Sequence, residues 1–168
     1  MKEILEVDLP GFKAKYDVEW IETDNLSGLE NVKQVYGVLF NDLGEVLIVN
    51  TVGNWQLPGG KPEHNESLLD TLVRECIEEA DAEIEGVIPL GYQYVKQIDD
   101  LKEYPKICQI RFAAKIKKLN EPTIDPATDK IPERKFINVD DFLDYCPWGK
   151  IGIHIVKLAK KKVFDRQK

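Results

Sequence analysis

The sequence predicts an α+β protein in which a mixed β-sheet is flanked by helices. Several segments have the alternating or β-rich pattern of strands, and two segments have the three- and four-residue apolar spacing of helices. Because the strands come as hairpins around one strong helix and a terminal helix, we expect sheet and helices to pack as layers. The length of 168 residues, 43% of them hydrophobic, suits a single domain over residues 1–168.

The expected strands are short and are separated by turn signals. They cover residues 16–21, 32–40, 46–50, 55–57, 83–97, 107–116 and 135–138. The first lies in an N-terminal extension of strands and turns, residues 1–31, which also contains the turn signal Leu9-Pro10-Gly11, and Asn41-Asp42-Leu43-Gly44 closes a hairpin. Pro58-Gly59-Gly60 is expected neither to continue a ladder nor to start a helix, and Pro89-Leu90-Gly91 is expected to interrupt a strand.

Residues 67–80 have the clearest helical pattern. Their apolar side chains are expected to form one buried stripe that consists of Leu69, Leu72, Val73, Cys76, Ile77 and Ala80. Ser67 is a good N-cap, and Asp70 completes a pair that resembles a capping box. A second helix is expected over 151–164, with its lysines outward and its basic end solvated rather than bound to a phosphate or a membrane.

Composition argues against several classes of function. The net charge of −7 opposes general affinity for nucleic acids, which require a basic surface. No apolar run is long enough to span a bilayer and acids interrupt the N-terminus, so we expect a cytoplasmic protein without membrane partners. The three cysteines lack close spacing and are expected to be reduced core residues: Cys76, Cys108 and Cys146.

Three glutamates on the expected helix are the strongest chemical signal. Glu75, Glu78 and Glu79 stand at i, i+3 and i+4, so their carboxylates crowd one helix face. Such crowding destabilises a helix by roughly a few tenths of a kcal/mol per pair unless a cation offsets it. Mg²⁺ prefers carboxylate oxygens and is a natural partner. The alternative is a solvated acidic face that forms salt bridges with nearby lysine or arginine.

Residues 60–82 resemble the Nudix box, Gly-x5-Glu-x7-Arg-Glu-U-x-Glu-Glu-x-Gly-U, in which U is a bulky aliphatic residue. The matching positions are Gly60, Glu66, Arg74, Glu75, Glu78 and Glu79. Cys76 and Ala82 replace aliphatic residues, and Asp81 stands where the box ends its helix with glycine. Aspartate adopts the left-handed conformation more readily than most residues, so we expect a slightly strained but intact helix end. The resemblance implies a Nudix-like α/β/α sandwich.

The resemblance also implies a metal site and a general base. Mg²⁺, or Mn²⁺ in its place, would be bound by the three glutamates and by the main-chain carbonyl of Gly59. The catalytic residue would be Glu75 or Glu78. An acid on a distant loop is the other choice, and the loop candidates are Glu121, Asp125, Asp129 and Glu133.

Further roles follow for residues around the metal site. Arg74 and Glu66 would form a salt bridge that supports the site, and Gly60 would let the backbone approach the metal. Lys61 and Trp55 are weaker candidates for substrate binding. For Lys61 the alternative is an ordinary surface position, and for Trp55 it is core packing.

The implied function is Mg²⁺-dependent hydrolysis of a pyrophosphate bond in a nucleoside diphosphate derivative, by attack of water on one phosphorus. ADP-ribose-cleaving members usually carry proline near residue 98, and dinucleoside polyphosphate hydrolases carry tyrosine there, whereas this chain has Ile98, Asp99 and Asp100. A nucleoside triphosphate or related nucleotide is therefore favoured. The alternatives are an ADP-ribose or nucleotide-sugar pyrophosphatase and a catalytically silent nucleotide sensor. The expected partner is a small-molecule nucleotide, and a homodimer stays open.

Overall fold

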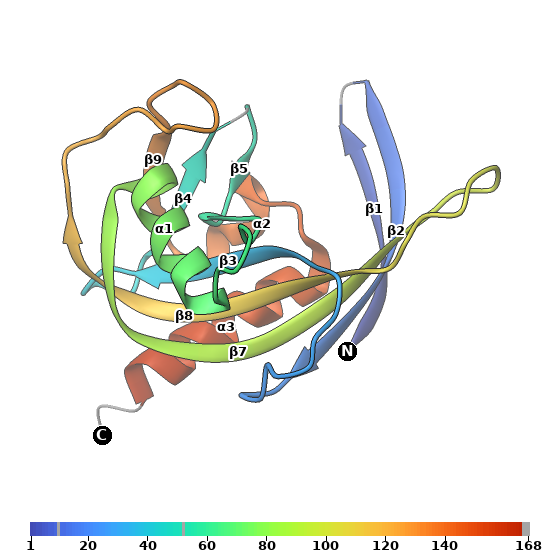
Figure 1. The fold of residues 1–168 in the computed structure, drawn as a ribbon, viewed down its shortest axis with the longest axis horizontal. Coiled ribbons are helices and arrows are strands. Elements are labelled where there is room, and N and C mark those ends of the chain that lie inside the picture. Colours follow the sequence, from blue (N-terminus) through green and yellow to red (C-terminus); the bar gives the residue numbers. More distant parts are fainter. Residues whose placement is uncertain (10, 52, 166–168) are drawn as a thin grey trace.

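The computed structural model describes residues 1–9, 11–51 and 53–165 (Figure 1). Its strands are β1 (Lys2–Leu9), β2 (Phe12–Glu22), β3 (Val32–Phe40), β4 (Val46–Asn50), β5 (Trp55–Gln56), β6 (Gly59–Gly60), β7 (Ala82–Ile98), β8 (Ile107–Leu119) and β9 (Glu133–Ile137). Its helices are α1 (Leu68–Ala80), α2 (Phe142–Tyr145), α3 (Gly149–Asp165) and the 3₁₀ turn η1 (Val139–Asp141).

The described strands form one mixed sheet in the order β1-β2-β7-β8-β3-β4-β5, with β6 paired to β3 and β9 paired to β4. β3 and β8 are parallel, and the other described pairs are antiparallel. The long strands β7 and β8 run through the middle of the sheet and curve strongly (Figure 1). The β1–β2 hairpin extends the sheet beyond β7.

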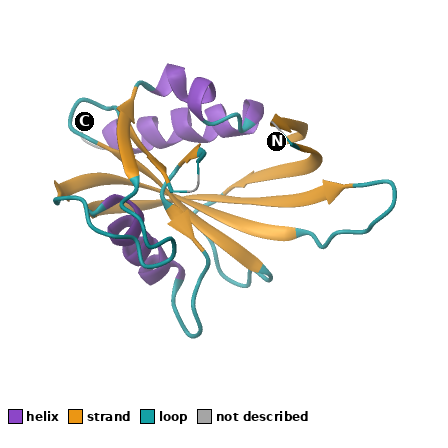
Figure 2. Cartoon of the chain, turned by 90° about the horizontal axis from the view of Figure 1, so that it is seen from above, coloured by secondary structure: helices purple, strands orange, loops and turns teal. Residues whose placement is uncertain are grey.

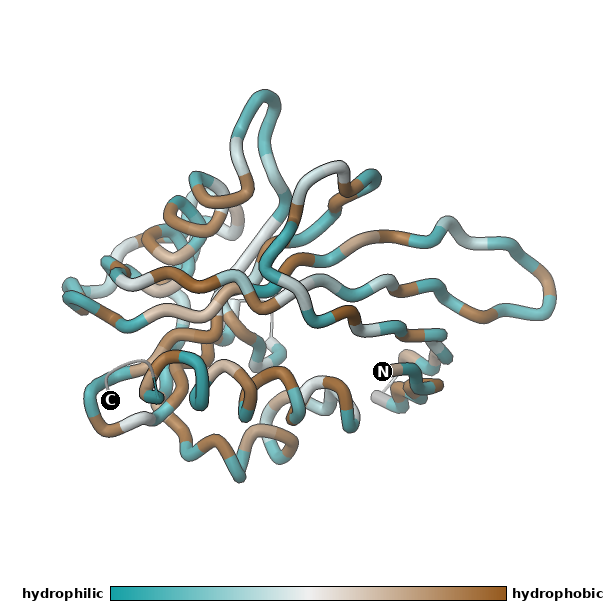
Figure 3. The backbone as a smooth tube through the Cα atoms, turned by 90° about the horizontal axis from the view of Figure 1, so that it is seen from below, coloured by the Kyte–Doolittle hydropathy of each residue, from teal (hydrophilic) through white to brown (hydrophobic). Residues whose placement is uncertain are grey.

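Helices cover both faces of this sheet, with α1 on one face and α2 and α3 on the other (Figure 2). Two hydrophobic clusters correspond to these faces. Leu72 and Cys76 of α1 pack with Ile110 and other strand residues in one cluster, and Ile155 of α3 packs with Val38 and its neighbours in the second. Apolar stretches gather in the central strands and helices, and the projecting loops are largely hydrophilic (Figure 3). The predicted α/β/α sandwich is confirmed.

Helix α1 begins at Leu68 with Ser67 as its N-cap, whose hydroxyl accepts the backbone N–H of Asp70 at 3.1 Å. The predicted apolar stripe is wrong in half of its members. Leu72, Cys76 and Ala80 are buried, whereas three others remain 48%, 44% and 40% exposed: Leu69, Val73 and Ile77. The exposed row is offset by three residues, about 60° around the axis, and lies on the flank that the sheet does not cover.

The turn-rich segments differ from expectation in two places. Gly59–Gly60 forms the short strand β6 with β3, so the prediction that it could not continue a ladder is wrong. A Cβ at Gly59 would overlap the carbonyl of Val35, and only glycine permits this close pairing. β7 continues through Pro89-Leu90-Gly91, where the predicted interruption amounts to a shift of register against β8.

The N-terminal extension is more regular than expected. It contains two paired strands, β1 and β2, where the sequence indicated one short strand over 16–21. Pro10, in the predicted turn between them, lies outside the described residues. The three cysteines are buried and unpaired, as expected. In the described part of the chain, no helix is long and apolar enough to cross a membrane.

Candidate active site

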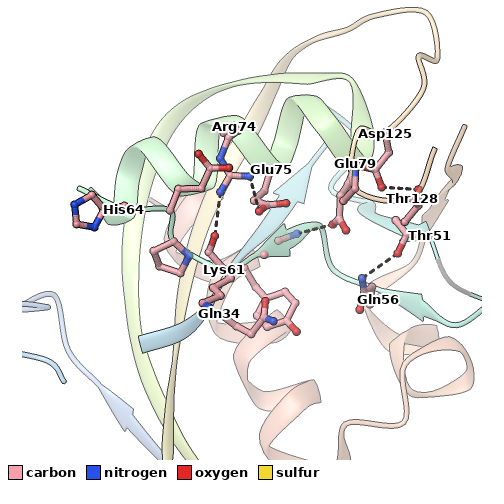
Figure 4. Close-up of a pocket in the computed structure, with 16 residues that line it drawn as sticks. Gln34, Thr51, Gln56, Lys61, His64, Arg74, Glu75, Glu79, Asp125 and Thr128 are labelled. Atoms are coloured by element: carbon pink, nitrogen blue, oxygen red, sulfur yellow. Dashed lines mark hydrogen bonds and ion pairs between the residues drawn. The ribbon is translucent and has the colours of Figure 1, made fainter. Parts of the chain in front are cut away.

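A pocket of about 820 Å³ opens between α1, β3, β6 and the loop before β9 (Figure 4). Acidic side chains dominate its charge, because Glu75 and Glu79 enter from α1 and Asp125 enters from the loop. The three carboxylates face the same space, whereas the His64 ring lies at the outer rim and points away (Figure 4). One turn of α1 and a loop more than 40 residues later in the chain thus supply a single acidic centre.

Glu75 and Glu79 are carboxylates in an unfavourable environment. Glu75 is 8% exposed, and Glu79 accepts a hydrogen bond from the backbone N–H of Gly59 at 2.8 Å. Burial raises the pKa of Glu79 to about 8, and the carboxylates of Glu75 and Asp125 add to this effect. Burial also raises the pKa of Glu75, against the opposing effect of Arg74. A cation among these groups would offset both the energetic cost of burying charged carboxylates and the repulsion between them.

Arg74 connects the carboxylates of α1 to the preceding loop. It donates to Glu66 at 2.8 and 3.0 Å, to Glu75 at 2.7 Å and to Glu78 at 3.0 Å. A further N–H binds the carbonyl of Lys61 at 3.0 Å. The hydrogen bonds from Arg74 hold the pKa of Glu66 at about 2. The ion pair expected between Arg74 and Glu66 is present, and it fixes residues 61–66 against the helix.

The pocket suits a hard divalent cation by its chemistry. A Cβ at Gly60 would overlap the carboxylate of Glu75, so the backbone comes as close to this side chain as a residue without a side chain allows. Yet no three acidic, histidine or cysteine groups of the described residues form a preassembled metal cluster. Arg74 holds Glu75 and Glu78, and Gly59 holds Glu79. Metal binding therefore has to compete with these hydrogen bonds.

Comparison with known proteins agrees with the Nudix-like fold and with the acidic pocket described above. A family model of the NUDIX domain matches residues 30–153. The chain belongs to the Nudix hydrolase family. Over 99 residues it is 34% identical to the 8-oxo-dGDP phosphatase NUDT18 of Danio rerio, a match that covers 55% of this chain and 30% of that protein. The chain thus spans about 30% of the length of this curated relative.

Solved structures show the same fold. The pyrophosphohydrolase BsRppH of Bacillus subtilis has a TM-score of 0.70 at 19% identity, with 89% of this chain and 93% of that chain covered. The mutator protein MutT of Bacillus halodurans has a TM-score of 0.58 at 22% identity, with coverage of 75% and 80%. At these identities the likeness concerns the Nudix fold alone.

The end of the Nudix box has a second structural task in this chain. Asp81 adopts the left-handed conformation (φ 49°), as its replacement of glycine predicts. Its buried carboxylate accepts the backbone N–H of Thr123 at 3.1 Å and also its hydroxyl, and its carbonyl accepts the N–H of Asn120 at 2.8 Å. Asp81 therefore anchors the loop that carries Asp125.

The structure distinguishes between the four loop acids that the sequence offered as the general base. Asp125 is 1% exposed and lines the acidic pocket. Its carboxylate accepts the N–H of Ala127 and the hydroxyl of Thr128, each at 2.8 Å. The other three acids are exposed and do not line the pocket: Glu121, Asp129 and Glu133. Of the two box candidates, Glu75 lines the pocket, whereas Glu78 pairs with Arg74 at its edge and keeps 28% of its side chain exposed.

The two weaker candidates for substrate binding lie in neighbouring pockets. Lys61 lines the acidic pocket, and Trp55 lines a second pocket of about 660 Å³. Tyr36 and Gln56 line both pockets, and neither was expected from the sequence. Arg111, which lines the second pocket, was also missed. The available signal was a charged residue within the apolar run from Ile107 to Ile116.

Proposed function

We propose that this chain is a pyrophosphohydrolase that cleaves a pyrophosphate bond of a nucleotide and requires Mg²⁺, with Mn²⁺ able to replace it. One observation carries the proposal: the carboxylates of Glu75, Glu79 and Asp125 line one open pocket, with Glu75 and Asp125 buried and Glu79 half-buried. Acidic side chains alone would repel a polyphosphate, so the pocket needs bridging cations to accept one. The family to which the chain belongs generally uses divalent metals of this kind.

Glu75 and Glu79 are the side chains that would hold the metal, with the backbone of Gly59 and Gly60 beside them. A bound Mg²⁺ supplies charge neutralisation and polarisation of the P–O bonds. Glu78 stands at the edge, and its part in binding depends on release from Arg74. Arg74 and Glu66 keep the loop at 61–66 against α1, which holds Lys61 at the rim, where its ammonium can approach a phosphate.

The chemical step requires a group that removes a proton from the attacking water. Asp125 is the loop acid that faces both metal-binding glutamates, and we assign it this task, with Glu75 as the alternative within the box. The hydrogen bonds from Ala127 and Thr128 fix the orientation of its carboxylate. Attack at one phosphorus would yield a nucleoside monophosphate together with phosphate, pyrophosphate or a phosphorylated remainder.

We infer that the substrate is a nucleoside di- or triphosphate. The 8-oxo-dGDP phosphatase of Danio rerio supports this choice by its name and its 34% identity. ADP-ribose and nucleotide sugars are the competing substrates, since an ADP-ribose pyrophosphatase from Streptococcus suis shares the fold at a TM-score of 0.52. The sequence at residues 98–100 favours the first class over the second.

A substrate panel tests the proposal. Purified protein is incubated with Mg²⁺ and with nucleoside di- and triphosphates, 8-oxo-dGDP, ADP-ribose, a nucleotide sugar or a diadenosine polyphosphate, and the products are separated by ion-exchange chromatography. We expect cleavage of nucleoside di- or triphosphates that stops with EDTA and is lost in the E79Q variant. Turnover that survives both treatments would exclude the assigned site, and binding without turnover would favour a nucleotide sensor.

A further inference from the structure

The second pocket, of about 660 Å³, adjoins the acidic pocket through Tyr36 and Gln56. Its floor is the sheet face that carries α3. Successive strand residues point to opposite faces, so Gln109 and Arg111 of β8 lie on this face together, and Gln93 of β7 pairs with Gln109 across the ladder. The β1–β2 hairpin forms one wall, and α2, the segment that joins it to α3, and the first turn of α3 form another.

Arg111 is a buried cation in the floor of this pocket. It is 2% exposed, and its guanidinium carbon lies 4.3 Å from the ring centroid of Tyr36 and 5.3 Å from that of Trp148. Burial lowers its pKa to about 10, so it remains charged at neutral pH. Among the described residues no carboxylate forms an ion pair with it.

The donors of Arg111 exceed the acceptors around it. One Nη donates to the side-chain oxygen of Gln109 at 3.0 Å, and the other donates to the carbonyl of Ile110 at 3.2 Å. The buried Nε finds no acceptor in the described part of the chain. A guanidinium has five N–H donors. Each Nη carries two N–H groups and makes one of the hydrogen bonds above, so a ligand that supplies acceptors to the remaining Nη–H groups pairs donors that have no partner in the described part of the chain.

The other lining groups indicate what carries those acceptors. Rings of Trp55, Tyr145 and Trp148 and aliphatic side chains of the hairpin offer apolar surface, and Gln93 and Gln109 offer neutral amides. This combination suits a flat heteroaromatic ring with a polar edge better than it suits a second phosphate. Arginine binds paired acceptors such as O6 and N7 of guanine, whereas the same edge of adenine presents one acceptor and one donor.

We propose that the second pocket holds the base of the nucleotide and that Arg111 selects a purine with a carbonyl oxygen at C6, as in guanine. This inference rests on the proposed function, which places the phosphates of the same nucleotide in the acidic pocket. Tyr36 lies between the two pockets and would pack beside the sugar. The hairpin side chains of Leu5, Tyr16 and Val18 belong to the wall and precede the residues that match the family model, so this wall of the pocket lies outside the matched region.

The first test measures kcat/KM for GTP and ATP in the wild type, R111M and R111K. We expect the wild type to favour GTP by roughly tenfold or more, and both variants to bring the ratio close to one, because lysine lacks the planar fork. K115M is the matched control, since it removes a cation from the same strand outside the pocket and should keep the wild-type ratio. Circular dichroism and thermal midpoints establish that each variant is folded.

The second test separates this inference from the proposed function. Guanosine and adenosine, which carry no phosphate, are titrated in EDTA, and the intrinsic tryptophan fluorescence, to which Trp55 and Trp148 of the pocket contribute, is followed. Tighter binding of guanosine that is lost in R111M supports the inference even if no nucleotide is hydrolysed. Turnover without a preference for guanine, equal binding of the two nucleosides, or displacement of guanosine by inorganic phosphate in the wild type would overturn it.

Discussion

The carboxylate of Glu3 accepts a hydrogen bond from the backbone N–H of Ile151, 148 positions later in the chain, at 2.8 Å. Its second oxygen accepts the N–H of Lys150 at 3.0 Å. N–H groups in the first turn of a helix have no partner within the helix, and a negative charge there is stabilising. Glu3 of β1 therefore caps α3 and joins two elements that both contribute residues to the second pocket.

Replacing Glu3 by alanine is expected to lower the free energy of unfolding by about 1 kcal/mol, because it removes a helix cap. Urea denaturation followed by circular dichroism gives the change. E6A is the matched control on the same strand, since the ion pair of Glu6 with Lys15 is exposed and such pairs contribute about 0–1 kcal/mol. Equal midpoints for E3A and the wild type would contradict the capping role.

The stability of the protein is expected to fall in acid through Glu66. Arg74 holds the pKa of Glu66 at about 2 in the folded state, below the unfolded value of about 4.3. A carboxyl with a depressed pKa stabilises the fold at pH values above its unfolded pKa. This stabilisation is lost as the pH falls from there towards 2.

The variant E66Q isolates this contribution. Its free energy of unfolding is expected to lie well below that of the wild type at pH 7, and the difference is expected to shrink to about half by pH 3. Urea titrations at pH 3, 4, 5 and 7 provide the comparison. E121Q is the control, since Glu121 is exposed and should follow the wild type at every pH. A constant difference between E66Q and the wild type across this range would show that the charge of Glu66 does not stabilise the fold.

Mg²⁺ is expected to stabilise the wild type against heat and to stabilise E79Q far less. Ligand that binds only the folded state adds RT ln(1 + [L]/Kd), about 2.7 kcal/mol at a hundredfold excess over Kd. Thermal midpoints are measured in EDTA and in increasing MgCl₂. E85Q, an exposed change on β7, should respond as the wild type does. A full Mg²⁺ response in E79Q would remove Glu79 from the metal site.

Gly60 is expected to tolerate no side chain, because a Cβ there would overlap the carboxylate of Glu75. The variant G60A should therefore lose most of its Mg²⁺-dependent turnover. G86A is the control for replacing a glycine, since a Cβ at Gly86 would meet no neighbour within 4 Å, although its positive φ adds local strain. Wild-type turnover in G60A would mean that the backbone at Gly60 does not have to approach Glu75.

The local sequence was enough to predict the main elements of the fold, but not which of their faces are covered or which strands pair. The capped helix α1 and the left-handed Asp81 follow from residues close in the chain, and both were predicted correctly. The exposed side of α1 could not be predicted, because Leu69 and Leu72 are equally apolar and only the position of the sheet decides which one is covered. The strand at Gly59–Gly60 was missed for the same reason, since its partner β3 lies more than 20 residues away.

In the candidate site, too, the residues that lie close in sequence were predicted, and those that depend on distant contacts were not. The three helical glutamates of the box, Glu75, Glu78 and Glu79, lie in one helix with Arg74, so their spacing alone brought them together. Asp125 could be proposed only as one of four loop acids, because its place depends on the contact between Asp81 and Thr123, which lie 42 positions apart. For Arg111 the sequence offered only a charged residue within an apolar strand, and a strand pattern does not show whether a buried cation will find a partner.

Replacing Asp125 by asparagine is expected to lower kcat by roughly 10²–10⁴-fold, the range typical of a positioned general base. Asparagine has the same shape, and its Oδ1 can accept the N–H of Ala127 while its Nδ2 donates to the hydroxyl oxygen of Thr128, so the loop should stay folded. D129N is the matched control in the same loop, because Asp129 is exposed and lies outside the pocket. A pH–rate profile separates the assigned roles: a base gives an acidic limb that D125N abolishes, whereas a residue that only positions the loop would lower kcat at every pH and leave that limb in place. The second result would move the base to Glu75.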